Sequence, residues 1–257
     1  MTDAGRIAEK LRERGCPMPV FSFREIDSTN GEAKRQWRDG NGGTMLFIAE
    51  TQTAGRGRAG RPFYSASGAG LYFTLAFAEH ALPVPTQITQ AAAVAVALPT
   101  ERRTGCEIGI KWVNDLLLDG KKIAGILTES APCRGVTQYA VGVGLNLCGA
   151  VFPPELEGIA GALPVPVSEE ELLTDIVAAL MEFLRGEASF REAYRTRCCL
   201  LGREIEYRRN GETHRALALS LCENGALRVR HADGSEEDLF SGEVTLHREP
   251  EEKADIE

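Results

Sequence analysis

Residues 55–61 read Gly-Arg-Gly-Arg-Ala-Gly-Arg, and no other segment of the sequence has so clear a chemical signature. Glycines let the backbone approach a ligand closely and expose its N–H groups. Arginines add permanently charged, fork-shaped donors that match phosphate and carboxylate oxygens. We therefore expect an anion-binding loop that is mobile until a ligand orders it. The segment lacks the Gly-Lys-Ser/Thr of a P-loop, and taken alone it would also fit a solvated or RNA-binding loop.

Two further segments carry residues typical of ligand sites. Residues 111–115 read Lys-Trp-Val-Asn-Asp, and Lys121 and Lys122 follow an Asp-Gly dipeptide. A lysine that faces an apolar sheet needs an anionic partner, although lysines beside such turns are usually solvated. Residues 142–146 read Gly-Val-Gly-Leu-Asn. Glycines two apart clear one face of a strand, either for a ligand ring or for a crossing backbone.

The elements around these segments predict an α+β fold with a mixed sheet packed against helices. Apolar periodicity, cap residues and an Asp119-Gly120 hairpin turn set the expected boundaries. We expect strands at 20–26, 45–50, 71–77, 107–111, 116–118, 122–129 and 138–147, a break at 132–135, and helices around Ile7 and Leu11, at 31–38, at 86–103 and from 169 to about 199.

From Gly202 onward, short strands alternate with Asn-Gly or Asp-Gly dipeptides at 210–211, 224–225 and 233–234. Closely spaced turns of this kind predict a small antiparallel barrel or sheet. The expected strands are 204–208, 214–222, 226–231 and 243–247. We therefore expect a larger domain over 1–200, a small domain over 201–249, and a charged, disordered tail at 250–257.

Composition and charge exclude several functional classes. A length of 257 residues suits one large domain with a small one attached. The net charge of -8 argues against general affinity for nucleic acid. No apolar run reaches the ~20 residues of a membrane-spanning helix, and no signal peptide is recognisable. The seven cysteines follow no ligand spacing, so we expect no zinc site and a cytoplasmic location.

Taken in order, the motifs resemble those of the biotin protein ligases. The matching segments are Asp27-Ser28-Thr29-Asn30, residues 52–58, residues 111–115 running to Gly125, and residues 142–146. The resemblance is strong over residues 21–148, and the C-terminal strands fit the small SH3-like domain that follows the class II synthetase-like core of the family. Lipoate ligases share the core fold without this arginine loop. The resemblance implies an ATP-dependent biotin–[biotin carboxyl-carrier protein] ligase.

The resemblance also implies a mechanism and its residues. Biotin and ATP, with Mg²⁺, give biotinyl-5′-AMP, and a lysine on the biotin carboxyl carrier protein domain of a carboxylase then takes the biotinyl group. Lys122 would neutralise the carboxylate and the α-phosphate, Arg58 and Arg56 would close over the ligand, and Asp115 would orient or deprotonate the incoming lysine. The implied biotin-binding residues are Ser28, Thr29, Gln52, Gly55, Arg56, Lys122, Gly125, Gly142 and Gly144. The implied ATP- or adenylate-binding residues are Asn30, Arg58, Arg61, Phe63, Lys111, Trp112, Asn114 and Asn146, with no protein ligands to a metal.

Two departures from the family motif and several alternatives stay open. Val113 stands where the motif usually has proline and Phe63 where it usually has tryptophan, and neither departure removes a charge. Only residues 1–26 precede the first motif, so we expect no winged helix, no repressor activity and no nucleic-acid partner. A lipoate or other acyl-adenylate ligase, or a binding protein without turnover, would be an alternative. The sequence leaves the carrier protein, the adenylate affinity and the choice between monomer and homodimer undecided.

Overall fold

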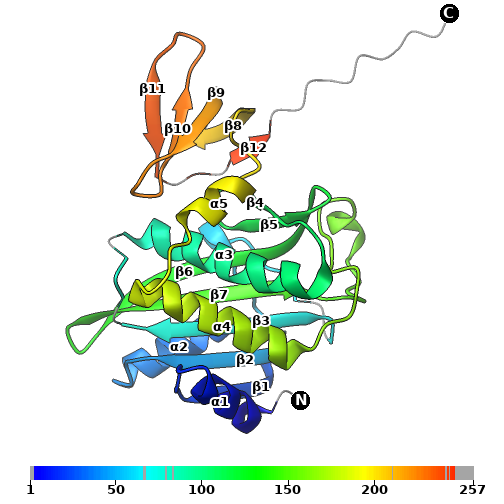
Figure 1. The fold of residues 1–257 in the computed structure, drawn as a ribbon, viewed down its shortest axis with the longest axis vertical. Helices are drawn as coiled ribbons and strands as arrows, with labels where there is room; N and C mark the ends of the chain where they lie inside the picture. Colours follow the sequence, from blue (N-terminus) through cyan, green and yellow to red (C-terminus); the bar gives the residue numbers. More distant parts are fainter. Residues whose placement is uncertain are drawn as a thin grey trace, which may run out of the picture.

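The computed structural model describes residues 3–65, 68–78, 80–82, 84–209, 211–240, 242 and 244–246, which form two sheets with helices packed on the larger one (Figure 1). The larger sheet has the order β1-β2-β3-β7-β6-β5-β4. Its strands are β1 (Val20–Ile26), β2 (Met45–Gln52), β3 (Gly70–Phe77), β4 (Gly109–Lys111), β5 (Asp115–Leu118), β6 (Lys121–Cys133) and β7 (Val136–Asn146). Only β1 and β2 pair in parallel among these strands. The prediction of a mixed sheet in an α+β fold is therefore confirmed.

The two faces of this sheet are covered by different helices. Successive side chains of a strand point to opposite faces. Along β2, Leu46 and Ile48 belong to the main core with α3 (Pro85–Thr104) and α4 (Glu169–Arg185), whereas Met45 and Phe47 pack with α2 (Thr29–Arg38). Figure 1 shows α3 and α4 together on one face. Helix α2 covers only part of the other face, and the remainder is free for a ligand site.

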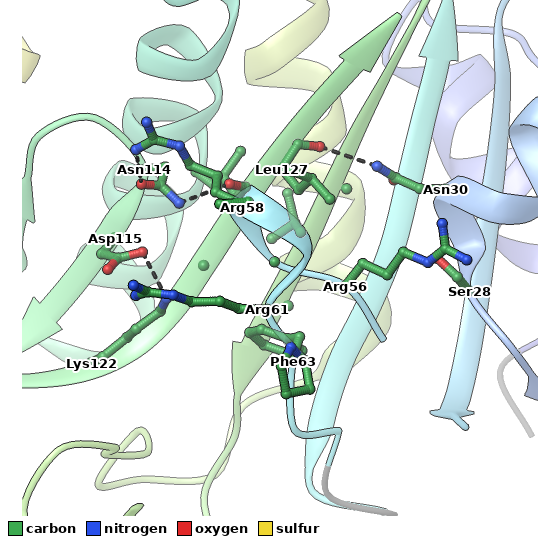
Figure 2. A pocket seen from close by; sticks show the side chains of 18 of the residues that line it. Ser28, Asn30, Arg56, Arg58, Arg61, Phe63, Asn114, Asp115, Lys122 and Leu127 are labelled. Atoms are coloured by element: carbon green, nitrogen blue, oxygen red, sulfur yellow. Dashed lines mark hydrogen bonds and ion pairs between the residues drawn. The ribbon is translucent and has the colours of Figure 1, made fainter. Parts of the chain in front are cut away.

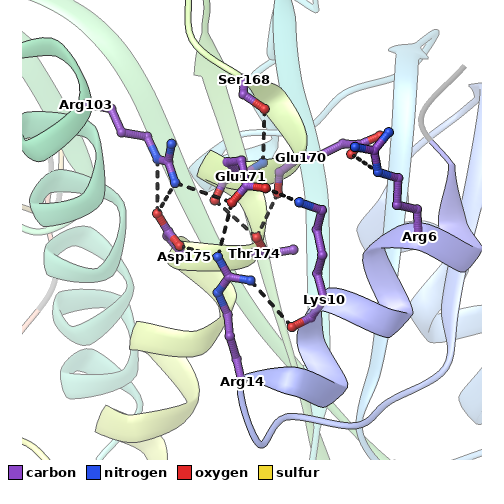
Figure 3. A network of polar contacts seen from close by, with 9 residues as sticks. All are labelled: Arg6, Lys10, Arg14, Arg103, Ser168, Glu170, Glu171, Thr174 and Asp175. Carbon is purple, nitrogen blue, oxygen red and sulfur yellow. Dashed lines mark hydrogen bonds and ion pairs between the residues drawn. The ribbon is translucent and has the colours of Figure 1, made fainter.

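Helix α1 (Ala4–Glu13) is held against α4 and α3 by a network of ion pairs (Figure 3). Asp175 lies at its centre, 2.9 Å from Arg14 Nη2 and 3.0 Å from Arg103 Nε. Burial raises the pKa of Asp175, but the two guanidinium groups outweigh burial and hold the pKa below its ordinary value. The network fixes the N-terminal helix beside the sheet, away from the glycine-bearing strands.

The second sheet is antiparallel, with the order β11-β10-β9-β8-β12. Its strands are β8 (Glu204–Arg209), β9 (Glu212–Leu221), β10 (Leu227–Arg230), β11 (Glu236–Leu239) and β12 (Val244–Leu246). The short helix α5 (Arg191–Arg197) leads into it (Figure 1). The turn at Gly225 docks on the large unit, because its carbonyl accepts hydrogen bonds from Gln90 Nε2 at 3.0 Å and Trp112 Nε1 at 3.1 Å.

Several predicted boundaries differ from the structure. Strand β6 continues to Cys133, so the expected break at 132–135 is only the hairpin turn to β7. Strand β11 was not predicted, because its sequence Glu-Glu-Asp-Leu looks like a solvated segment; its charges pair across the strands, as between Arg228 and Asp238. The predicted positive φ at the Asp119-Gly120 turn is confirmed, at 49° and 74°. The tail at 250–257, and the ends of the strand expected at 243–247, lie outside the described residues.

Candidate active site

A pocket of about 450 Å³ lies on the face of the large sheet that α2 leaves uncovered, and this volume falls within the ~300–1,000 Å³ of small-molecule sites. It brings together residues that are far apart in the sequence (Figure 2). The predicted residues that line it are Ser28, Thr29, Asn30, Gln52, Arg56, Arg58, Arg61, Phe63, Lys111, Trp112, Asn114, Asp115, Lys122, Gly125, Gly142 and Gly144.

The floor of the pocket consists of glycines on two paired strands. Gly125 of β6 pairs with Gly144 of β7, and Gly142 follows on the same face. A Cβ at Gly144 would lie 2.4 Å from the ring of Phe63, and one at Gly142 would lie 2.4 Å from Asn30 Oδ1. The glycines are thus required because a ring and an amide already lie against the strands. The space over this strand face is thus taken by the Phe63 ring and the Asn30 amide, and its clearance for a ligand ring stays a prediction.

A β-bulge aims Lys122 into the pocket. The register between β5 and β6 shifts at Leu116/Leu117, so that Asp115 pairs with Gly125 while Leu117 pairs with Lys122. In a regular strand, residues 122 and 125 would point to opposite faces. Here Lys122 Nζ lies 3.0 Å from the position of a Cβ on Gly125 and 2.7 Å from Asp115 Oδ1. The bulge therefore places an ammonium group and a carboxylate side by side at the pocket wall (Figure 2).

The strand end that carries Lys122 is also fixed through its backbone. Lys122 N–H donates to Ile159 O, and Lys122 O accepts from Gly161 N–H, both at 2.8 Å. Segment 159–161 thus acts as an additional pairing partner at the start of β6. Both the N–H and the C=O of Lys122 are therefore held by this segment, whereas the Lys122 side chain keeps 34% of its exposure.

The segment 111–115 is anchored to three different parts of the fold. Trp112 donates to Gly225 O of the second sheet, and Val113 O accepts a hydrogen bond from Tyr194 Oη at 3.2 Å. Asn114 Nδ2 donates to Ile126 O at 3.0 Å. The motif is therefore a rigid turn, with Val113 in place of the usual proline and a cis peptide bond between Trp112 and Val113.

The arginine loop folds back on itself. Phe63 N–H donates to Gly55 O at 2.9 Å, and Gly57 N–H donates to Arg61 O at 2.7 Å. Between these two hydrogen bonds, Arg56 and Pro62 form an isolated antiparallel β-bridge. Arg58 Nη1 donates to Asn114 Oδ1 at 3.1 Å. Figure 2 shows Arg61 on the side of Asp115 and Lys122, and Arg56 on the side of Ser28 and Asn30. The three guanidinium groups are thus spread along the pocket, and the expected ordering of this loop by a ligand stays a prediction.

Hydroxyl and amide groups gather at the opposite end from Lys122, and we call Ser28, Thr29, Asn30 and Gln52 the hydroxyl-amide end. Ser28 is the N-cap of α2 and accepts from Gly31 N–H at 3.3 Å. The Thr29 backbone N–H donates to Gln52 Oε1 at 2.9 Å. Asn30, which we expected to support adenylate binding, lies here with Thr29, and that role stays a prediction. We call Arg58, Arg61, Asp115 and Lys122 the charged end.

A carboxylate that sequence reasoning missed lies behind the hydroxyl-amide end. Glu129 follows Gly125 and Leu127 on the same face of β6 and accepts from Asn30 Nδ2 at 2.9 Å and from Lys34. Burial raises the pKa of Glu129, but the hydrogen bonds from Lys34 and Asn30 and the charges of Lys34 and Arg56 outweigh burial and lower it below the ordinary value. Glu129 is therefore an anion at neutral pH.

Two predicted residues do not line the pocket. Gly55 pairs with Phe63 at the base of the loop, where a Cβ would lie 2.7 Å from Phe63 O. Asn146 is buried and donates to Gly161 O at 2.9 Å, so it holds segment 159–161 rather than facing the cavity. Gly55 supports the site through its backbone and Asn146 through its side-chain amide, which their types alone do not reveal.

Some lining residues were not predicted. Gly57, Ala59 and Pro62 belong to the arginine loop, and Ile126, Leu127 and Val143 lie between predicted site residues, so the motifs themselves contain the signal for them. Gly242 and Val244 come from the second sheet. No local feature of the sequence marks these last two, because only the docking of the second sheet brings them to the pocket.

The described residues contain no group of three or more His, Cys, Asp or Glu side chains arranged to hold a metal ion. The carboxylate at the pocket wall, Asp115, is already paired with Lys122. In the part of the chain that the structure describes, no helix is long and apolar enough to cross a membrane.

Comparisons with known proteins identify the family of the chain and similar folds. Residues 22–146 match the Biotin/lipoate A/B protein ligase family. The chain is 31% identical to the biotin--[acetyl-CoA-carboxylase] ligase of Paracoccus denitrificans, over 81% of this chain and 92% of that protein. It is 40% identical to the bifunctional ligase/repressor BirA of Bacillus subtilis over 49% of this chain, and so spans only 40% of that relative.

Solved structures show the same fold. A biotin protein ligase from Aquifex aeolicus in complex with biotin and ATP superposes with a TM-score of 0.74 at 24% identity, covering 90% of this chain and 99% of that chain. At this level of identity, the likeness concerns the arrangement of elements alone.

Proposed function

The chain belongs to the Biotin/lipoate A/B protein ligase family, and from that membership we propose that it is an ATP-dependent biotin protein ligase. In the first half-reaction, the carboxylate of biotin attacks the α-phosphate of ATP, forming biotinyl-5′-AMP and releasing pyrophosphate. In the second, the ε-amine of a carrier lysine attacks the mixed anhydride, forming an amide and releasing AMP.

The observation that carries the proposal is the meeting of Lys122 and Asp115 with two loop arginines, Arg58 and Arg61, at one end of the pocket. The other end offers hydroxyls and amides. Two anions that repel one another must approach for adenylation, and fixed cations lower that barrier most when they are positioned in advance. We propose that Lys122 contacts both the carboxylate and the α-phosphate oxygens. Biotin would then lie with its carboxylate at the charged end and its ureido ring at the hydroxyl-amide end.

We propose that Arg58 and Arg61 hold the nucleotide phosphates. Arg58 is already oriented by Asn114, which is fixed to Ile126 O. Arg56, on the side of Ser28, would close over biotin (Figure 2). A folded loop over the anhydride would also exclude water, which would otherwise hydrolyse it.

We propose that Asp115 serves the second half-reaction. Its carboxylate is 22% exposed and lies 2.7 Å from Lys122 Nζ, so it can accept a hydrogen bond from an incoming amine at the pocket wall. The acceptor would be a lysine on a biotin carboxyl carrier protein domain. We further propose that residues 201–249 are the SH3-like domain of the family, with residues 1–200 as the catalytic domain.

The test is ATP–pyrophosphate exchange, with biotin and lipoate offered separately, followed by label transfer to a carrier domain. We expect exchange and labelling with biotin only. Exchange with lipoate alone would reassign the substrate, and ligand binding without pyrophosphate turnover would contradict the assignment as an enzyme. The net charge of -8 leads us to expect no operator binding, and a gel shift in the presence of biotinyl-5′-AMP would test that expectation.

A further inference from the structure

Behind the hydroxyl-amide end, a chain of hydrogen bonds continues beyond the pocket wall. Thr74 of β3, which is fully buried and absent from the pocket lining, contacts Thr29 Oγ1 at 2.7 Å and Asn30 Oδ1 at 2.6 Å. Asn30 Nδ2 lies 2.9 Å from Glu129 Oε2 and 3.3 Å from Leu127 O. The chain runs in the order Gln52, Thr29, Thr74, Asn30, Glu129 and Lys34.

The available protons fix the direction of this chain. A carboxylate and a backbone carbonyl can only accept, so the Asn30 NH₂ group must face Glu129 and Leu127 O, and its carbonyl must face Thr74. The single hydroxyl proton of Thr74 therefore goes to Asn30. The contact between Thr74 and Thr29 must then use the proton of Thr29.

The direction determines what the Thr29 hydroxyl presents to a ligand. The Thr29 backbone N–H holds Gln52 Oε1 at 2.9 Å whichever way the hydroxyl protons point. Because the hydroxyl proton of Thr29 points to Thr74, the 3.2 Å contact between Thr29 Oγ1 and Gln52 Oε1 carries no proton, and Thr29 Oγ1 offers only lone pairs to the pocket. The pocket thus offers an acceptor at Thr29, which suits a ureido N–H of biotin.

We propose that Thr74 and Glu129 are positioning residues that fix the direction of these hydrogen bonds and thereby set the affinity for the biotin ring, an inference that rests on the proposed function. Neither residue lines the cavity. Thr74 links Thr29 to Asn30, and the acceptor-only carboxylate of Glu129 orients the Asn30 amide. Their effect reaches the ligand through Thr29 and Asn30.

The proposal explains why a carboxylate, rather than an amide of the same shape, stands at position 129. A glutamine there could turn its NH₂ group toward Asn30. The Asn30 amide could then reverse, Thr74 would donate to Thr29, and the whole chain would have two orders instead of one. In the second order Thr29 would carry a proton that can point to Gln52 or into the pocket, so part of the protein would no longer present Thr29 as an acceptor, and biotin affinity would fall by the fraction lost.

The test compares Thr74→Val, Thr74→Ser and Glu129→Gln in the full-length protein. The matched controls are Thr100→Val, which also removes a fully buried hydroxyl but one bonded only to Val96 O in α3, and Glu101→Gln, which weakens the half-buried pair with Arg197. Steady-state exchange gives kcat and the KM values for biotin and ATP. Calorimetry gives the Kd for biotin without turnover, and thermal unfolding identifies variants that fail to fold.

We expect Thr74→Val and Glu129→Gln to raise the biotin KM and Kd about tenfold, with kcat and the ATP KM changed less than about threefold. Thr74→Ser and both controls should stay within about twofold of wild type.

The proposal is wrong if both test variants bind biotin like wild type, if Thr74→Ser is as impaired as Thr74→Val, or if the controls match the test variants. Should Thr74→Val not fold, Glu129→Gln decides. Absence of exchange in the wild type would instead overturn the proposed function, while the biotin Kd values would still test the network.

Discussion

The two ends of the pocket are built in different ways. At the hydroxyl-amide end, Thr29 and Asn30 are 3% and 4% exposed, and each is held by partners on other elements. At the charged end, the side chains of Lys122 and Asp115 keep 34% and 22% of their exposure. One end is buried and fixed, whereas the other is open and charged.

The difference follows from what each end would do. Recognition of an uncharged ring requires donors and acceptors at fixed positions, because an unpaired polar group on either side costs binding energy. The charged end would have to accept a carboxylate, a phosphate and finally an amine. Lysine and arginine side chains at the rim can adjust to these successive partners, and their backbones stay anchored, as Lys122 is by Ile159 and Gly161.

The largest effect should come from removing the ammonium group at the charged end. We expect Lys122→Ala to lower exchange activity by about 10²–10³-fold, since a preorganised charge at the reacting centre is lost. Lys121→Ala, the exposed neighbour on the same strand, is the control. Binding of biotin methyl ester, which lacks the carboxylate, should be unchanged in both. Loss of ester binding in Lys122→Ala would contradict the separation of the two ends.

The next largest effect should come from alanine substitution of a glycine beneath one end of the pocket, and it differs between the two ends. A Cβ at Gly142 would meet Asn30 Oδ1 at 2.4 Å, whereas one at Gly125 would meet the flexible end of Lys122 at 3.0 Å. Because hydrogen bonds hold Asn30 and Lys122 can move, Gly142→Ala should raise the biotin KM by about 10–100-fold, and Gly125→Ala by several-fold less. Exchange kinetics of the two variants test this order. Equal losses would mean that the ends do not differ in rigidity.

A smaller effect concerns the support of Trp112 by the second sheet. Gly225 and Gly234 have nearly the same φ, 84° and 85°, but a Cβ at Gly225 would lie 2.7 Å from Gln90 Oε1, while one at Gly234 meets nothing within 4 Å. Gly234→Ala should cost about 1–2 kcal/mol of stability from backbone strain alone.

For Gly225→Ala we expect about 1–3 kcal/mol more, because the docking hydrogen bonds from Gln90 and Trp112 are disturbed as well. Denaturant unfolding measures the difference. If Trp112 depends on the turn, Gly225→Ala should also raise the KM for ATP, and Gly234→Ala should not. Equal stability of the two variants would show that the docked turn contributes nothing.

The smallest effect concerns the entry to α2 at the hydroxyl-amide end. The bidentate hydrogen bond from Arg35 lowers the pKa of Asp27 from 3.8 to about 2. A lowered pKa in the folded state contributes stability above 3.8, and this contribution is lost as the pH falls toward about 2. Near neutral pH, the free energy of unfolding of Asp27→Asn should therefore be slightly lower than that of the wild type. The two values should converge in acid.

Much of the fold could be predicted from local sequence. Alternating apolar residues gave β1 its predicted bounds, the composition of α3 indicated burial on most sides, and the Asp119-Gly120 dipeptide adopts the predicted turn. Strand β11 could not be found in this way, because its charged side chains are stable in a strand only beside the arginines of β10. Its pairing is a property of two segments, not of one.

What the sequence by itself determined is the chemical inventory of the site: arginines and glycines in one loop, a lysine near an aspartate, and glycines on one strand face. Only the tertiary structure decided where these groups point. The bulge opposite Leu116/Leu117 turns Lys122 into the pocket, while Gly55 and Asn146 face away from it. Thr74 and Glu129 became relevant through β3, β6 and α2 meeting at one point. The sequence states directly which side chains a segment carries. The direction in which those side chains point depends on strand register and on packing between segments that are distant in the sequence.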